Sequence, residues 1–194
     1  MAHFIENIEG QESEEYEVLN KDGSPAGIFK SREDIHRDGD WHRTVHVWVL
    51  GQDNTILVQK RSLGKKQFPG LFQLNVAGHV GKGEDTGSAC LKELFEELDI
   101  KPQQSQLQHL FTINWEYKHD DLSDREIQEV YLLSGDYTDE DLRLKSDEIE
   151  HAEFMPLRDV EVLIQEHINE LVPQVEEYGK VLTAIKDAIA QKAA

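Results

Sequence analysis

The chain has 194 residues and a formal net charge of −19, from 39 acidic and 20 basic side chains. This length predicts one domain, or one domain with a small appendage. The acidic balance argues against general nucleic-acid binding, which needs a basic surface to meet the phosphate backbone. A small phosphorylated substrate is still compatible with this charge if cations and a few Lys or Arg residues meet its phosphates.

Cysteine usage and hydropathy bear on where the protein works. Cys90 is the only cysteine, so neither an intrachain disulfide nor a cysteine-based zinc cluster can form. The first ten residues, MAHFIENIEG, lack the basic start and apolar run of a secretory signal. No stretch approaches the roughly 20 apolar residues of a membrane span. We therefore expect a cytoplasmic protein without a membrane partner.

The first part of the chain predicts two hairpins and a short helix. The Asp22-Gly23 dipeptide favours a tight turn between strands, and Ser31 is a typical helix cap. Two strands around that turn are expected within residues 16–29, followed by a short helix at 31–40. Two β-branched strands are expected at 44–50 and 55–60, and a basic loop at 61–70. We expect residues 1–30 to be an N-terminal extension packed on a core domain of residues 31–194.

The rest of the chain predicts a helix, three strands and two C-terminal helices broken near Pro173. A polar loop is expected over 118–124 and an acidic connection over 136–150. The three strands are expected at 107–117, 127–135 and 151–156, and the helical spacing begins at Leu157. Strands and helices without strict alternation predict an α/β or α+β sandwich around a mixed sheet.

Residues 78–100, GHVGKGEDTGSACLKELFEELDI, crowd carboxylates around one turn and one helix. The helix is predicted to begin near Asp85 or Thr86, either of which can cap it. At about 100° per residue, one stripe is apolar and the opposite side is acidic. The leucines are Leu91, Leu94 and Leu98, and the glutamates are Glu93, Glu96 and Glu97.

Two interpretations of this acidic helix are open. It can be a solvated outer face, in which Lys92 pairs with Glu96 four residues on. Alternatively, the glutamates hold a hard divalent cation, which prefers oxygen ligands and joins carboxylates to substrate phosphates. A glycine-rich loop that ends at Glu84 and the basic loop upstream favour the second interpretation, since glycines let the backbone approach a ligand closely.

The same residues resemble the Nudix motif, G-x5-E-x7-R-E-U-x-E-E-x-G-U, in which U is aliphatic. Lys92 stands where the motif has Arg, and Asp99 where it has Gly. Lys keeps the positive charge but lacks the bidentate fork of Arg. The positions that agree are Gly78, Glu84, Glu93, Leu94, Glu96, Glu97 and Ile100.

The resemblance extends over residues 30–160 and is strongest to the Nudix branch related to isopentenyl diphosphate isomerase. It implies a Nudix-like α/β/α sandwich around a mixed sheet, with an N-terminal β-hairpin and C-terminal helices. It also implies Mg²⁺- or Mn²⁺-dependent hydrolysis of a phosphoanhydride bond, in a nucleoside diphosphate linked to another group X or in a related small diphosphate.

Roles follow from the motif positions that match. Glu93 and Glu97 are the expected principal metal ligands and catalytic carboxylates, and Glu96 is expected as a third or water-mediated ligand. The carbonyl of Gly78 or Ala77 would add a backbone ligand. A supporting role is expected for Glu84 and Lys92. A catalytic or metal-binding role is expected for Glu129, for which Glu126 is the weaker alternative.

The same resemblance implies roles for the basic residues and the histidines. Phosphate contacts are expected from the basic loop, at Arg61, Lys65 and Lys66. The isomerase binds a metal through histidines, two of which align with His42 and His79, and His36 lies within one residue of a third. These three histidines are a possible second metal site. His46 would lie in the middle of a strand, and several of the nine histidines must be bystanders.

Two alternatives to hydrolysis stay open. An isomerase-like enzyme is disfavoured, because the isomerase carries an essential cysteine where this chain has Ala77, and a methyl group cannot transfer a proton. Cys90 lies on the predicted helix and is expected to pack in the core. A catalytically silent binding module with the Nudix fold is the second alternative. The C-terminal stripe of Leu182, Ile185 and Ile189 is expected to pack on the core, with a homodimer contact as the other possibility.

Overall fold

The computed structural model describes residues 14–119 and 122–192, so residues 1–13 of the predicted N-terminal extension lie outside the described residues. The predicted hairpin and capped helix are confirmed. β1 (Glu15–Leu19) and β2 (Pro25–Ser31) pair antiparallel, and α1 (Arg32–Asp38) follows. The Ser31 side chain accepts a hydrogen bond from the backbone N–H of Asp34, which satisfies one of the free donors at the start of the helix.

The described residues form a nine-stranded mixed sheet. Its central strand β3 pairs in parallel with β8 and antiparallel with β6, and β7 continues the sheet beyond β8. A second group of strands forms around β4, which pairs antiparallel with β5 and β9. The bounds of these strands are β3 Trp41–Leu50, β4 Thr55–Arg61, β5 Phe72–Gln73, β6 Val76–His79, β7 Leu107–His119, β8 Leu122–Ser134 and β9 Ile149–Pro156.

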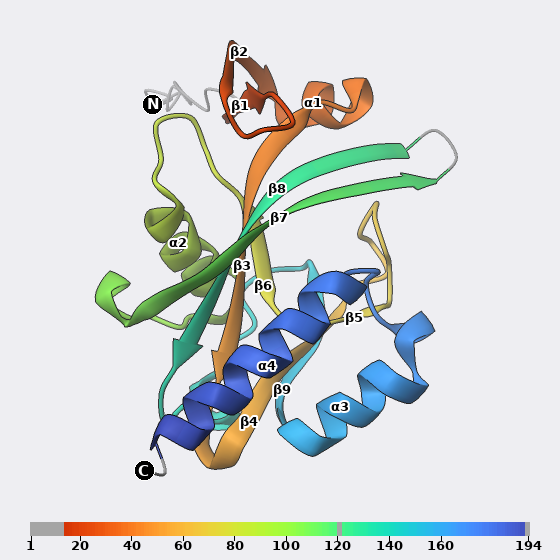
Figure 1. Ribbon diagram of the computed structural model, residues 1–194. Helices are drawn as coiled ribbons and strands as arrows, with labels where there is room; N and C mark the ends of the chain where they lie inside the picture. The colour runs from red at the N-terminus through yellow and green to blue at the C-terminus, as the bar shows by residue number, and fades with distance from the viewer. Residues whose placement is uncertain (1–13, 120–121, 193–194) are drawn as a thin grey trace, which may run out of the picture.

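The two groups of strands separate from a narrow junction. β3 and β4 are joined at a single residue pair, Leu50 with Ile56, next to the turn that connects them. From there β4 runs with β5 and β9, while β3 runs with β6 and β8, as Figure 1 shows. The sheet is therefore opened between these groups.

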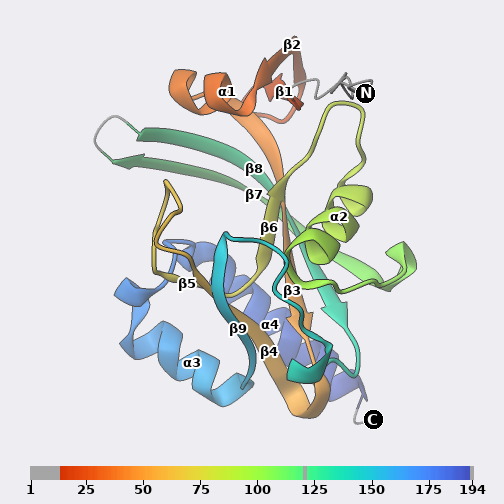
Figure 2. The same cartoon turned by 180° about the vertical axis from the view of Figure 1, so that it is seen from behind.

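Helices cover both faces of the sheet, which confirms the predicted sandwich (Figures 1 and 2). Successive residues of β3 point to opposite faces. Val47 joins the core under α2 (Thr86–Leu98), whereas Trp48 joins the core under α3 (Leu157–Glu166) and α4 (Val175–Lys192). None of the helices in the described ranges combines the length and apolar character that crossing a lipid bilayer requires.

The predicted packing of the C-terminal stripe is confirmed for Ile185, which is fully buried, and for Ile189, which packs against the same core. The break between the last two helices lies at residues 167–174, as Pro173 indicated.

The predicted polar loop at 118–124 is wrong, because most of it belongs to two long paired strands. Lys118 pairs with Ser123 and Tyr117 with Asp124 in the β7–β8 ribbon. A ribbon that extends from the protein body exposes side chains on both faces, so it lacks the apolar alternation by which strands are predicted. The short strands β5 and β6 were also not predicted, since two to four residues carry too little pattern.

The core beneath α4 can be tested by truncating Ile185. Ile185→Ala should lower the free energy of unfolding by about 2–5 kcal/mol, because it removes buried methyl groups and leaves a cavity. Urea unfolding measures this change. Val175→Ala on the same helix, where the side chain is 62% exposed, should change it by less than about 0.5 kcal/mol. Equal effects of the two substitutions would contradict the described packing.

Candidate active site

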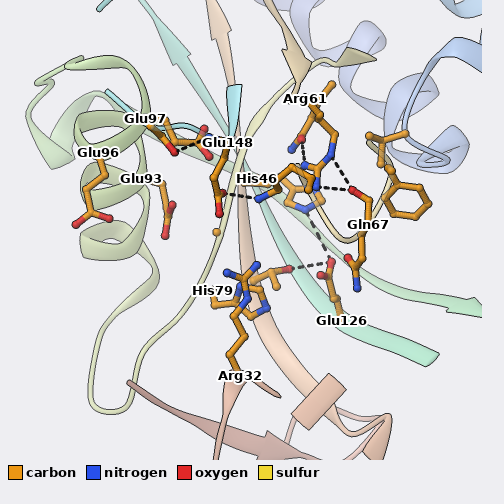
Figure 3. A pocket seen from close by; sticks show the side chains of 18 of the residues that line it. Arg32, His46, Arg61, Gln67, His79, Glu93, Glu96, Glu97, Glu126 and Glu148 are labelled. Carbon is orange, nitrogen blue, oxygen red and sulfur yellow. Dashed lines mark hydrogen bonds and ion pairs between the residues drawn. The ribbon is translucent and has the colours of Figure 1, made fainter. Parts of the chain in front are cut away.

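A polar cleft of about 410 Å³ lies where the two groups of strands separate. The glutamates of α2 line one wall, and His46, Arg61 and Gln67 lie across from them (Figure 3). The N-terminal hairpin contributes to the rim through Glu14 and Tyr16. Acidic and basic side chains thus face each other across one opening.

Helix α2 carries the acidic wall. Asp85 caps it by accepting a hydrogen bond from the Ser88 N–H, so the helix begins where the sequence predicted. Glu97 is 8% exposed and Gln59 Nε2 approaches its Oε2 at 3.4 Å. Burial, and then the charge of Glu93, raises the pKa of Glu97 to about 8. Burial likewise raises the pKa of Glu93 to about 7.

These two carboxylates are therefore disfavoured as free anions. Glu96 lines the rim of the cleft and is exposed. The ligand atoms of the three described glutamates do not all lie within 4.8 Å of one another. The second interpretation, a cation between them, needs the exposed Glu96 to turn or to act through water.

Gly78 lies directly against the acidic wall. A Cβ atom built on this glycine would lie 2.0 Å from the Glu93 carboxyl carbon. Any side chain at this position would displace Glu93, so glycine keeps the backbone of β6 in contact with the carboxylate. This close approach is what a backbone ligand beside a glutamate ligand requires.

The two predicted supporting residues have partners other than the motif glutamates. Lys92 pairs with Glu14 of the N-terminal hairpin at 2.6 Å, and not with Glu96. Glu84 accepts a hydrogen bond from the Gly81 N–H at 2.9 Å and closes the loop before the helix. Lys92 still lines the cleft beside Glu93.

The basic loop places two of its three predicted residues in the cleft. Arg61 donates to Gln73 Oε1 at 2.5 Å and to the Gln67 carbonyl at 2.9 Å, which holds its guanidinium in place. Lys65 forms an ion pair with Glu148. Lys66 is exposed and is not among the described residues that line the cleft.

The three predicted histidines come together from three elements. His36 of α1, His42 of β3 and His79 of β6 offer ring nitrogens within 4.8 Å of one another. His42 forms an equally close group with Asp124 and Glu126 of β8. Burial, and then the neighbouring His42, holds the pKa of His79 well below its usual value. Neutral imidazoles beside carboxylates are suitable metal ligands.

Two atoms of this group are buried without a hydrogen-bond partner among the described residues, His42 Nε2 and Asp124 Oδ1. Unpartnered buried polar atoms are costly. The two atoms lie 3.9 Å apart, so one cation between them would satisfy both.

Glu129 is not brought to the cleft, which corrects the sequence-based assignment. It forms an ion pair with Arg43 and accepts a hydrogen bond from Thr112 at 2.7 Å. Glu126 lines the cleft instead, and burial followed by Asp124 raises its pKa to about 7. Residues three apart on a strand lie on opposite faces, so only one of the two can enter the cleft.

Sequence reasoning missed Glu148 and Asp124. Both fell in segments predicted as polar connections, although each directly precedes or enters a strand that borders the cleft. The acidic residues directly before β9 were the available signal for Glu148.

Residues 40–176 match the family described as NUDIX domain. The chain belongs to the Nudix family. Nudix hydrolase 3 from Arabidopsis thaliana is 30% identical over 180 residues, which are 89% of this chain and 23% of that protein. The chain thus spans about a quarter of that relative's length.

Other comparisons agree with the predicted branch and fold. An isopentenyl-diphosphate Delta-isomerase from Pectobacterium atrosepticum is 24% identical over 144 residues, 74% of this chain and 76% of that protein. The crystal structure of DR0079 from Deinococcus radiodurans matches with a TM-score of 0.60 at 19% identity, over 78% of this chain and 88% of that one. The structural match shows the fold alone.

The raised pKa of Glu97 predicts how the metal-free stability depends on pH. Between the usual value of 4.5 and about 8, the folded protein holds a proton on Glu97 that the unfolded chain has released. The free energy of unfolding should therefore fall as the pH rises through this window. Urea unfolding in EDTA should show this slope, and Glu97→Gln should flatten it. An unchanged slope in the variant would contradict the assigned cause.

The contact between Gly78 and Glu93 gives a second test. Gly78→Ala should displace Glu93 and weaken Mn²⁺ binding, measured by calorimetry, at least about tenfold, because a misplaced ligand no longer meets the ion. Gly179→Ala on α4 is the matched control, since a methyl group there meets no described atom within 4 Å. Undiminished Mn²⁺ binding by a folded Gly78→Ala protein would contradict this geometry.

Proposed function

We propose that the protein hydrolyses a phosphoanhydride bond, in a nucleoside diphosphate linked to X or a related small diphosphate, with Mg²⁺ or Mn²⁺. The observation that carries the proposal is the half-buried Glu93 and the buried Glu97 across one cleft from Arg61 (Figure 3), with Lys65 also lining this cleft. Carboxylates whose ionisation is disfavoured by burial gain from a divalent cation, and the cations opposite suit phosphate oxygens. Membership of the Nudix family supports the same chemistry.

The residues proposed to act in the cleft divide into metal ligands and phosphate contacts. Glu93 and Glu97 hold the ion, together with the Gly78 carbonyl and with Glu96 from the rim. When bound, the ion neutralises phosphate oxygens and lowers the pKa of the attacking water. Arg61 and Lys65 bind the substrate phosphates, and Lys65 exchanges its partner Glu148 for them.

The reaction balances without another reactant. The oxygen of water forms a bond to phosphorus while the anhydride P–O bond breaks and its oxygen leaves with the electron pair. A carboxylate of the acidic wall accepts the proton that the water loses. Lys66 and Glu129 have no contact with the reacting groups in this scheme.

The histidine group is proposed as a second metal site. His36, His42 and His79 supply imidazole nitrogens, and Asp124 and Glu126 supply carboxylates. The donor set of nitrogen and oxygen atoms fits a transition metal such as Mn²⁺ or Zn²⁺ better than Mg²⁺. The unpartnered His42 Nε2 and Asp124 Oδ1 support this assignment.

The histidine group also supports the isomerase alternative, but the chain lacks the cysteine that transfers a proton in the isomerase. Ala77 lines the cleft where the isomerase has its cysteine. Cys90 is fully buried in the core under α2, and burial raises the pKa of its thiol. No other cysteine exists in the chain. Location in the cytoplasm, a homodimer and the division at residue 30 remain predictions.

A substrate panel with Mg²⁺ or Mn²⁺ tests the proposal. It includes nucleoside diphosphate derivatives and isopentenyl diphosphate, and both released phosphate and isomerisation are measured. Glu97→Gln should lower kcat/KM at least about 100-fold, because it removes a charged metal ligand. Glu166→Gln, an exposed position at the end of α3, should match the wild type. Isomerisation without any anhydride cleavage would contradict the proposal.

A further inference from the structure

A histidine in the middle of the central strand is held by a buried carboxylate from the C-terminal helix. His46 of β3 and Glu177 of α4 are 2% and 1% exposed, and His46 Nδ1 lies 2.6 Å from Glu177 Oε2. Glu177 also accepts from Trp48 Nε1 at 2.6 Å and from Asn75 Nδ2 at 2.8 Å. The carboxylate therefore has three donors around it, and its position is fixed.

Ionisation of this pair is favoured by its geometry. Burial alone would lower the pKa of His46, but the charge of Glu177 and its hydrogen bond raise it overall. Burial alone would raise the pKa of Glu177, but His46 and the other donors lower it. A carboxylate is acceptor-only, so Nδ1 carries a proton. Nε2 donates as well when the ring is an imidazolium, whose charge the Glu177 carboxylate balances at 2.6 Å.

That second nitrogen faces the cleft. His46 lines the cleft with Thr44 of the same strand, and its Nε2 lies 4.0 Å from Glu126 Oε2, beyond hydrogen-bond distance. In Figure 3 His46 lies beside Arg61, across the opening from Glu93 and Glu97. Nε2 thus lies on the same wall as Arg61, with Glu126 as its ion-pair partner at 4.0 Å and within reach of a phosphate oxygen in the cleft.

The same hydrogen-bond chain reaches Arg61. Asn75 donates to Glu177 and accepts from Gln73 Nε2 at 2.9 Å, while Gln73 Oε1 accepts from Arg61. Glu177 therefore fixes His46 directly and Arg61 through two amides. A residue of α4, one position beyond the matched family segment, connects both donors of this wall.

A purely structural role is the alternative. A buried ion pair rarely adds net stability over apolar side chains of similar size. The three donors around Glu177 satisfy its buried charge. They do not explain why one of these donors is a histidine that lines the cleft. If Glu177 positions His46 for a ligand, both the hydrogen bond at Nδ1 and the location of Nε2 at the cleft are explained.

We propose that His46 Nε2 binds a phosphate group of the substrate, and that Glu177 is the positioning residue that aims it. The ligand class is a diphosphate, with His46 and Arg61 on the phosphate that lies away from the acidic wall. This inference rests on the proposed function for the identity of the ligand. It assigns contact and positioning roles to two residues outside the motif.

Binding of imidodiphosphate, a diphosphate analogue with a P–N–P bridge, tests this inference by calorimetry in the presence of Mn²⁺. His46→Gln should weaken imidodiphosphate binding about 10- to 100-fold, the value of a hydrogen bond to a charged group. Glu177→Gln should weaken it as well, and the loss in the double variant should be smaller than the sum of the two single losses, because Glu177 acts partly through His46. Mn²⁺ binding to the acidic wall without the analogue should be unchanged.

His151→Gln on β9 and Glu176→Gln on α4 are matched controls, since both side chains are exposed. They should bind imidodiphosphate as the wild type does. If His46→Gln does not fold, Glu177→Gln carries the test, because it keeps the shape of the side chain and removes the negative charge beside the imidazole. Folded variants with wild-type affinity for imidodiphosphate would overturn the inference, and so would a purely additive double variant or a wild type that does not bind.

Different results would refute the proposed hydrolysis and the proposed His46 contact. A wild type that binds imidodiphosphate through His46 but cleaves no anhydride in the substrate panel would refute hydrolysis and leave this contact standing. A wild type that cleaves anhydrides while His46→Gln retains its KM would refute the contact and leave hydrolysis standing.

Discussion

The site depends on two carboxylates that are costly to ionise where they lie. Glu97 is almost fully buried, and its charge is opposed both by the loss of hydration and by Glu93. Such a pair is stable at neutral pH only if it binds protons or a cation. The apolar stripe of α2 holds the helix against the sheet, so the glutamates cannot withdraw into solvent. A divalent ion is the partner that this geometry favours.

The separation of the two strand groups places basic side chains opposite this acidic wall. Because β3 and β4 are joined only at Leu50 and Ile56, the cleft is bordered by strands on both sides. β6 brings Gly78 against Glu93, while β4 ends at Arg61 and the loop after it carries Lys65. Helix α4 stabilises the second wall from behind through Glu177. Catalytic geometry and core packing are consequently linked in one network of buried contacts.

Local patterns predicted much of the fold and part of the site. Ser31 and Asp85 mark helix starts because a cap depends only on the next three residues. The glutamate spacing of α2 is likewise a property of one helix. The facing residues could not be predicted in this way. Glu148 reaches the cleft through strand pairing and Glu177 reaches His46 through helix docking, each across more than 50 residues. Glu129 was misplaced because resemblance located the strand but not which face each of its glutamates occupies.

The most direct measurement is a crystal structure with Mn²⁺, with anomalous scattering recorded to locate the ion. The account predicts an anomalous peak between the Glu93 and Glu97 carboxylates, with the Gly78 carbonyl beside it. Both side chains turned into solvent, at saturating Mn²⁺ and with no peak between them, would contradict it.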